Sequence, residues 1–141
     1  MIRVTIWNEF RHEKTDERVQ KVYPDGIHMA LKRLLECDDV TVRTATLDDE
    51  ECGLTQEVLD ETDVLVWWGH MRHSDVPDEV AQRVRDAVQR GMGIIFLHSQ
   101  EPLGTEKLYT MMSKVLSNSL GVIVLICLNI LYISKLRTKY K

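Results

Sequence analysis

Residues 63–70 read DVLVWWGH, and this stretch decides the fold class. Its apolar part is short, continuous and rich in β-branched and aromatic side chains, a composition typical of a buried strand. The alternation of polar and apolar residues that a strand with one wet face would show is missing. The stretch therefore predicts a strand over 63–68 that is covered on both faces.

Short apolar stretches at residues 2–7 and 94–97 also predict strands, and residues 40–47 alternate strongly enough to predict another. Between the strands lie segments with helical spacing of apolar residues, at 24–37, 54–59 and 76–90. Thr55 is the expected N-cap of the second of these helices. Strands that alternate with helices form a parallel sheet with helices on both faces. We therefore predict a doubly wound α/β fold over residues 1–99.

The C-terminal part has a different texture, and we divide it into a linker or helix at 100–114 and an apolar helix with a basic tail at 115–141. Its apolar centre, residues 120–133, reads LGVIVLICLNILYI. A cluster of Lys and Arg follows, as is expected on the cytoplasmic side of a membrane helix. Only the longer stretch 115–136 reaches the ~20 residues that a bilayer requires, and it includes several polar side chains. Three interpretations stay open: a transmembrane segment, a buried core helix and an out-of-frame terminus.

Charge divides the chain in the same place. Residues 1–114 carry all 22 acidic side chains and 14 of the 18 basic ones, a net charge of −8, whereas residues 115–141 have a net charge of +4. An acidic body excludes a general nucleic-acid binder, because phosphate binding needs a basic face. The three cysteines lack the spacing of a disulfide framework or zinc ribbon, and the N-terminus has no apolar segment of signal-peptide length. We therefore expect a cytoplasmic protein, held at a membrane if the apolar run is a span.

Three histidines follow strand ends in this arrangement: His12 after the first strand, His70 after the third and His98 after the fourth. In an open parallel sheet the carboxyl ends of the strands meet at one edge, where ligands bind. Imidazole suits general acid–base chemistry near neutral pH, so we predict these three residues as catalytic. Imidazoles also bind metal ions, and a metal held by His12, His70 and His98, with a carboxylate added by Glu9 or Glu13, is a second hypothesis. The alternative to both is a set of surface or hydrogen-bonded structural histidines.

Four more residues at the same edge are predicted to bind substrate: Glu9, Arg11, Trp68 and Ser99. The first two supply polar groups. Trp68 offers a stacking platform for a sugar ring, although a tryptophan at a strand end also serves as core packing. Ser99 lies in the turn after the fourth strand, but the GxSxG pattern of a serine nucleophile is absent, which favours a helix cap.

Several motifs occur in order along the first 99 residues: VTIWNEFRHE at 4–13, YPDGIH at 23–28, DVLVWWGH at 63–70, GMG at 91–93 and LHS at 97–99. Together they resemble the ThuA-like trehalose-utilisation family. The resemblance implies a class I glutamine amidotransferase-like fold, which is a flavodoxin-like three-layer arrangement. It also implies a role in the metabolism of trehalose, related disaccharides and their keto derivatives. No cysteine occupies the turn after the fourth strand, which argues against glutamine hydrolysis.

The resemblance ends near residue 99, whereas members of the family continue with the second half of the domain. We therefore expect a sheet truncated to about four strands, followed by the apolar C-terminal helix. Two functions stay open: a ThuA-like protein of carbohydrate metabolism, either active or inactivated by truncation, and a non-enzymatic remnant or interaction module attached to a membrane. A small carbohydrate is the expected partner of the first. The sequence leaves the reaction, the cofactor and the oligomeric state open.

Overall fold

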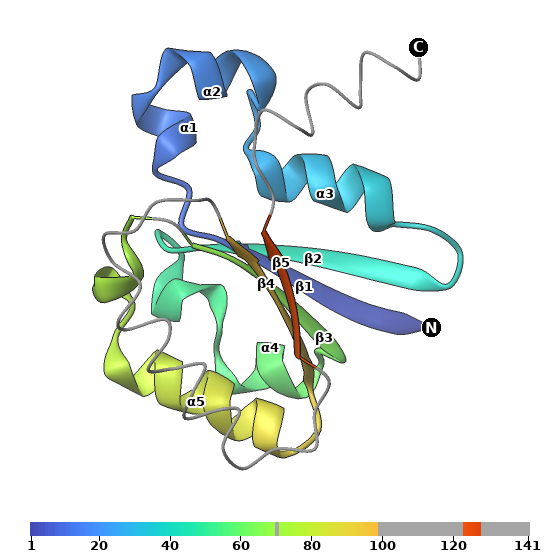
Figure 1. Cartoon of the computed structure of the whole chain (residues 1–141). Coiled ribbons are helices and arrows are strands. Elements are labelled where there is room, and N and C mark those ends of the chain that lie inside the picture. Colours follow the sequence, from blue (N-terminus) through green and yellow to red (C-terminus); the bar gives the residue numbers. More distant parts are fainter. Residues whose placement is uncertain (70, 99–122, 128–141) are drawn as a thin grey trace.

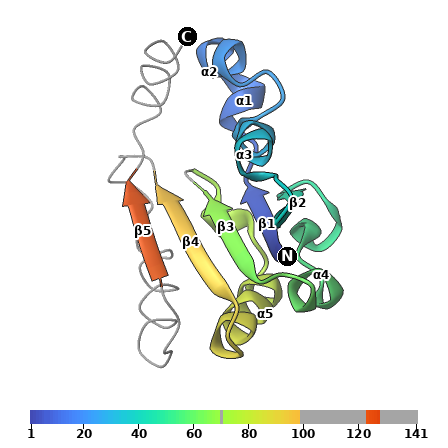
Figure 2. The ribbon, with the colours of Figure 1, turned by 90° about the vertical axis from the view of Figure 1, so that its right-hand side faces the viewer.

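Five parallel strands form the central sheet in the part of the chain that the computed structural model describes, which is residues 1–69, 71–98 and 123–127. Their order across the sheet is β2-β1-β3-β4-β5, and the arrows of β1, β3, β4 and β5 point the same way in Figure 2. The strands are β1 (Ile2–Asn8), β2 (Val40–Thr46), β3 (Val64–Trp68), β4 (Gly93–His98) and β5 (Ile123–Cys127). The predicted parallel α/β sheet is thus confirmed.

Helices cover both faces of the sheet, which gives the three layers seen in Figure 1. On one face lie α1 (His12–Thr15), α2 (Glu17–Val22) and α3 (Ile27–Leu35), and on the other lie α4 (Gln56–Asp60) and α5 (Asp78–Gln89). Two short 3-10 turns, η1 (Glu50–Gly53) and η2 (His73–Asp75), lie in the segments that follow β2 and β3. This is the flavodoxin-like arrangement that the sequence predicts.

The side chains of β1 enter two separate cores. Val4 and Ile6 pack with Ile27 on the face that α3 covers. Trp7 enters the core on the α5 face, where its indole stacks on Trp67 with the ring centroids 4.0 Å apart. Both faces of β1 are therefore buried from Val4 onward.

The three predicted helices are present with shifted ends, as α3, α4 and α5. The Thr55 hydroxyl accepts a hydrogen bond from the amide of Val58 at 3.3 Å, so the predicted N-cap of α4 is confirmed. The sequence did not predict α1 and α2, because the polar stretch between the first strand and Pro24 shows no sustained apolar period.

The C-terminal apolar segment differs from the prediction. Ile123–Cys127 forms β5, which pairs in parallel with β4 from Ile94 opposite Ile123 to His98 opposite Cys127. The predicted helix over 115–141 is therefore wrong at these positions, and the sheet has a fifth strand. The physical reason is that β4 presents backbone N–H and C=O groups that need partners, and a short apolar run can satisfy them as a strand. The predicted linker at 100–114 and the other residues of the predicted helix lie outside the described residues.

The ranges that the structure describes contain no helix that is both long enough and apolar enough to cross a bilayer. The longest helix there, α5, has 12 residues, whereas a span requires about 20. The predicted transmembrane segment at 115–136 is not supported, since residues 123–127 of it form a strand. The other residues of this segment lie outside the part of the chain that the structure describes.

Candidate functional site

The order of the strands places a crevice beside β1. The chain leaves β1 towards β2 on one side and later returns as β3 on the other side, so the segments that follow β1 and β3 turn to opposite faces of the sheet. At such a switch point the carboxyl ends of the strands leave a crevice in which ligands bind. The candidate site therefore lies at the carboxyl ends of β1 and β3. We call this place the β1–β3 edge and define it as residues 8–13, from the last residue of β1, and residues 69–75, which follow β3.

Asn8, the last residue of β1, is the centre of a buried hydrogen-bond network. Its Oδ1 accepts from the amide of Phe10 at 2.9 Å, which fixes the orientation of the carboxamide. Its Nδ2 then donates to Glu13 Oε1 and to His28 Nδ1, each at 2.9 Å. Glu13 Oε1 also accepts from the amide of Ile27 at 3.1 Å, at the start of α3. The network thus connects β1, α1 and α3 through side chains that are buried.

The same network assigns the tautomer of His28. Because Asn8 donates to Nδ1, that nitrogen is an acceptor and the proton of the neutral ring is on Nε2. Burial lowers the pKa of His28 from 6.5 and outweighs the opposing effect of the Glu13 carboxylate. The ring is therefore neutral at pH 7, and Phe10 packs edge-on against it at a centroid distance of 5.0 Å.

Glu9 turns towards the loop that follows β3. The residue is 2% exposed, and its carboxylate accepts hydrogen bonds from the amides of Met71 and Arg72, at 3.0 Å in each case. Its own amide donates to the carbonyl oxygen of Trp68 at 3.1 Å. Glu9 therefore holds together the two segments that border the β1–β3 edge.

Arg11 and Lys14 turn to the loop that follows β2. Arg11 makes two hydrogen bonds to the carboxylate of Asp48, at 2.8 and 2.6 Å, and Lys14 adds a third at 2.6 Å. These cations hold the pKa of Asp48 well below its usual value. Phe10 lies between Glu9 and Arg11 and has a φ of 49°, a left-handed conformation that is uncommon for a bulky residue. Such strained residues cluster at functional sites.

The structure brings several of the predicted site residues together. Glu9 and Arg11 lie in the turn after β1, Trp68 ends β3, and His12 is the first residue of α1. Trp68 is 3% exposed and packs in the core on the α3 face, which agrees with the packing alternative rather than with an open stacking platform. Arg11 is paired with Asp48, so this contact connects the turn after β1 to the loop after β2.

The remaining predicted residues are only partly described. His98 is the last residue of β4, and its backbone lies opposite Cys127. His70 and Ser99 lie outside the described residues, so a common site for the predicted histidines stays a prediction. Among the residues that are described, no group of three or more His, Cys, Asp or Glu side chains could hold a metal ion.

Sequence reasoning missed Asn8 and His28 as members of the site, and it named Glu13 only as a carboxylate that could join the histidines at a metal. A signal was present, because all three fall in the motifs at 4–13 and 23–28 that carry the family resemblance. Their contact depends on α3 beginning beside the end of β1, and the spacing of the residues along the chain does not show this.

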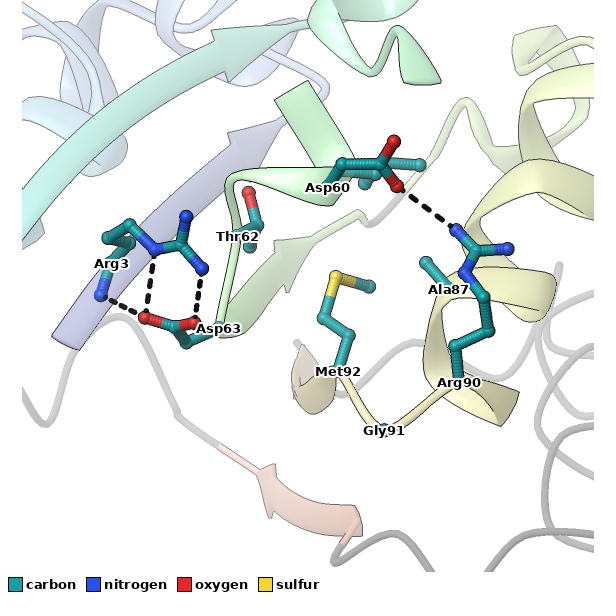
Figure 3. Close-up of a pocket in the computed structure, with 9 residues that line it drawn as sticks. Arg3, Asp60, Thr62, Asp63, Ala87, Arg90, Gly91 and Met92 are labelled. Carbon is teal, nitrogen blue, oxygen red and sulfur yellow. Dashed lines mark hydrogen bonds and ion pairs between the residues drawn. The ribbon is translucent and has the colours of Figure 1, made fainter. Parts of the chain in front are cut away.

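A hollow of about 330 Å³ lies at the opposite edge of the sheet, near the starts of β1, β3 and β4 (Figure 3). Two ion pairs line it, Arg3 with Asp63 at 2.7 Å and Arg90 with Asp60 at 3.3 Å. Each arginine is thus neutralised by a carboxylate. Ligands of this fold class bind at the carboxyl ends of the strands, so we do not take the hollow as the candidate site.

The family model described as ThuA, trehalose utilisation, matches residues 3–115 of the chain. The search of curated proteins found no match to the chain. The match includes both segments of the β1–β3 edge and extends past residue 99, where the motifs seen in the sequence end.

Proposed function

This chain belongs to the ThuA trehalose-utilisation family, and we propose that it binds trehalose or a related disaccharide at the β1–β3 edge. The observation that carries the proposal is the buried polar network there, formed by Asn8, Glu13 and His28 inside the family match. Ligand sites combine mostly apolar walls with a few polar groups held at fixed positions, and this network fixes the turn after β1.

The histidines His12, His70 and His98 are our candidates for proton transfer to and from the bound sugar. Arg11 and Ser99 are our candidates for contacts with its hydroxyl groups. The support for these roles is that His98 ends β4 and the other residues follow β1, β3 or β4 along the chain, and the carboxyl ends of these strands lie at one edge of the sheet. Imidazole exchanges protons near neutral pH, so the reaction class that we propose is acid–base chemistry on a sugar or its keto derivative.

Isothermal titration calorimetry with trehalose and with 3-keto-disaccharides tests this function. We expect saturable binding of at least one of these sugars and weaker binding after His70→Ala. Arg90→Ala is a suitable control because Arg90 lies at the opposite edge, and it should leave the affinity unchanged. A folded chain that binds none of these sugars would refute the proposal.

A second candidate is a non-enzymatic interaction module, the alternative that the sequence leaves open. The observation that favours it is the exposure of two neighbouring leucines at the end of α3, Leu34 at 76% and Leu35 at 42%. An interaction module would keep its fold but show no affinity for the sugars, so the same titration separates the two functions.

A further inference from the structure

We propose that Glu9 is a positioning residue, whose buried carboxylate anchors the loop after β3 in place and does not contact the sugar. The proposal changes the role expected from the sequence, which made Glu9 a substrate-binding residue. Only the statement that this loop borders a sugar site rests on the proposed function. The anchoring itself is a property of the folded chain.

Glu9 contacts this loop and the end of β3 both as an acceptor, through its carboxylate, and as a donor, through its amide. Oε1 accepts from the amide of Met71, and Oε2 accepts from the amides of Met71 and Arg72. The amide of Glu9 donates in turn to the carbonyl oxygen of Trp68, at the end of β3. A segment that is 62 residues away along the chain is thereby fixed to the turn after β1.

A buried carboxylate is a strong anchor for such a loop. Hydrogen bonds from amides to a charged oxygen are about twice as strong as those between neutral groups. Successive backbone N–H groups form a concave binding place for an anion, and Glu9 supplies that anion from within the chain. Removing the charge would leave the partly buried amides of Met71 and Arg72 without their acceptor.

The loop has few apolar anchors of its own. Met71, Arg72, Ser74 and Asp75 are exposed, and the nearest buried side chain after them is Val76, just before α5. A segment with so little buried surface opens readily unless hydrogen bonds restrain it. The Glu9 carboxylate therefore determines how the part of the loop at Met71 and Arg72 lies relative to β1.

Amide hydrogen exchange measured by NMR on the full chain tests the anchoring directly. In Glu9→Ala we expect the amides of Met71 and Arg72 to exchange about tenfold faster or more, beyond any change in global unfolding. Glu9→Gln, which keeps one acceptor oxygen, should give an intermediate rate and provides a milder variant if Glu9→Ala does not fold.

Glu13→Gln is the matched control, because Glu13 is a buried carboxylate of the same turn that accepts from the amide of Ile27 instead. It should accelerate exchange at Ile27 and leave Met71 and Arg72 unchanged. Added formate should restore slow exchange at these two amides in Glu9→Ala, whereas chloride at the same ionic strength should not.

Two outcomes would overturn the proposal. The first is exchange at Met71 and Arg72 in Glu9→Ala that is no faster than global unfolding allows. The second is loss of sugar binding in Glu9→Ala while these amides stay protected, which would make Glu9 a contact to the ligand. A wild-type chain that binds no sugar would refute the proposed function alone, since the exchange rates report the anchoring independently.

Discussion

The two edges of the sheet treat their polar side chains in opposite ways. At the β1–β3 edge the ion pairs of Asp48 with Arg11 and Lys14 are partly exposed, but four polar residues are buried and bonded to one another or to the backbone: Asn8, Glu9, Glu13 and His28. At the opposite edge the charged side chains lie at the surface, with Arg3 49% and Asp63 40% exposed, around a hollow. The hollow and the buried polar groups are therefore found at different edges.

The difference shows which feature is informative about function. Exposed ion pairs contribute little to stability, because water solvates the partners almost as well when they are apart. Buried polar groups destabilise a fold unless every one of them is satisfied. A network that meets this requirement at the carboxyl ends of the strands indicates a site more strongly than the shape of a surface does.

The largest effect is expected from Glu13→Ala. Asn8 Nδ2 and the amide of Ile27 would both lose a buried acceptor, and each loss costs about 1–3 kcal/mol, so the free energy of unfolding should fall by about 4 kcal/mol. Urea denaturation measures the change. Glu13→Gln keeps an acceptor oxygen and should lose less.

Alanine substitutions at two glycines with positive φ, one at each edge, test the same difference through the backbone. At Gly26, with φ 88°, an added Cβ would clash with the His28 ring and approach Phe10 Cε2 to 2.8 Å, whereas at Gly91, with φ 116°, it meets nothing within 4 Å. Both alanine variants carry the conformational cost, but only Gly26→Ala also forces the network apart. We expect it to lower the free energy of unfolding by about 2 kcal/mol more than Gly91→Ala does. Equal losses in thermal or urea unfolding would show that the packing around His28 adapts freely.

A smaller effect is the pH dependence that His28 contributes. Its pKa in the folded chain lies below the value of 6.5 for the unfolded chain, so the unfolded chain binds the proton more readily. Stability should therefore decrease as the pH falls below 6.5, and above that pH this residue contributes no pH dependence. Urea denaturation of the wild type and of His28→Gln between pH 7 and about 5 measures the contribution, and parallel curves for the two proteins would contradict it.

The smallest effect is expected at the opposite edge. Asp63→Ala removes a carboxylate that is bonded to Arg3 but lies in water, so the midpoint of urea unfolding at pH 7 should change only slightly. Arg3 lowers the pKa of Asp63 to about 2, hence the contribution of this pair is present above pH 3.8 and is lost as the pH falls through about 2. If Asp63→Ala lowered the free energy of unfolding as much as Glu13→Ala does, the two edges would not differ in how their polar side chains contribute to stability.

The strands were predictable from the sequence where burial on both faces leaves a continuous apolar run. Residues 63–68 illustrate this, because β3 occupies nearly the same positions. The strand at 123–127 was not predictable, since a short apolar run fits a buried helix and a buried strand equally well. Only the edge of β4, against which it pairs, distinguishes the two.

The sequence by itself determined the family and the parallel sheet, because these follow from motifs and from local apolar patterns. The tertiary structure decided what each polar residue does. Trp68 enters the core, Glu9 binds the loop after β3, and Glu13 joins Asn8 to α3. The physical reason is that the partner of a buried polar group comes from a distant part of the chain, and packing of the helices on the sheet is what brings the two together.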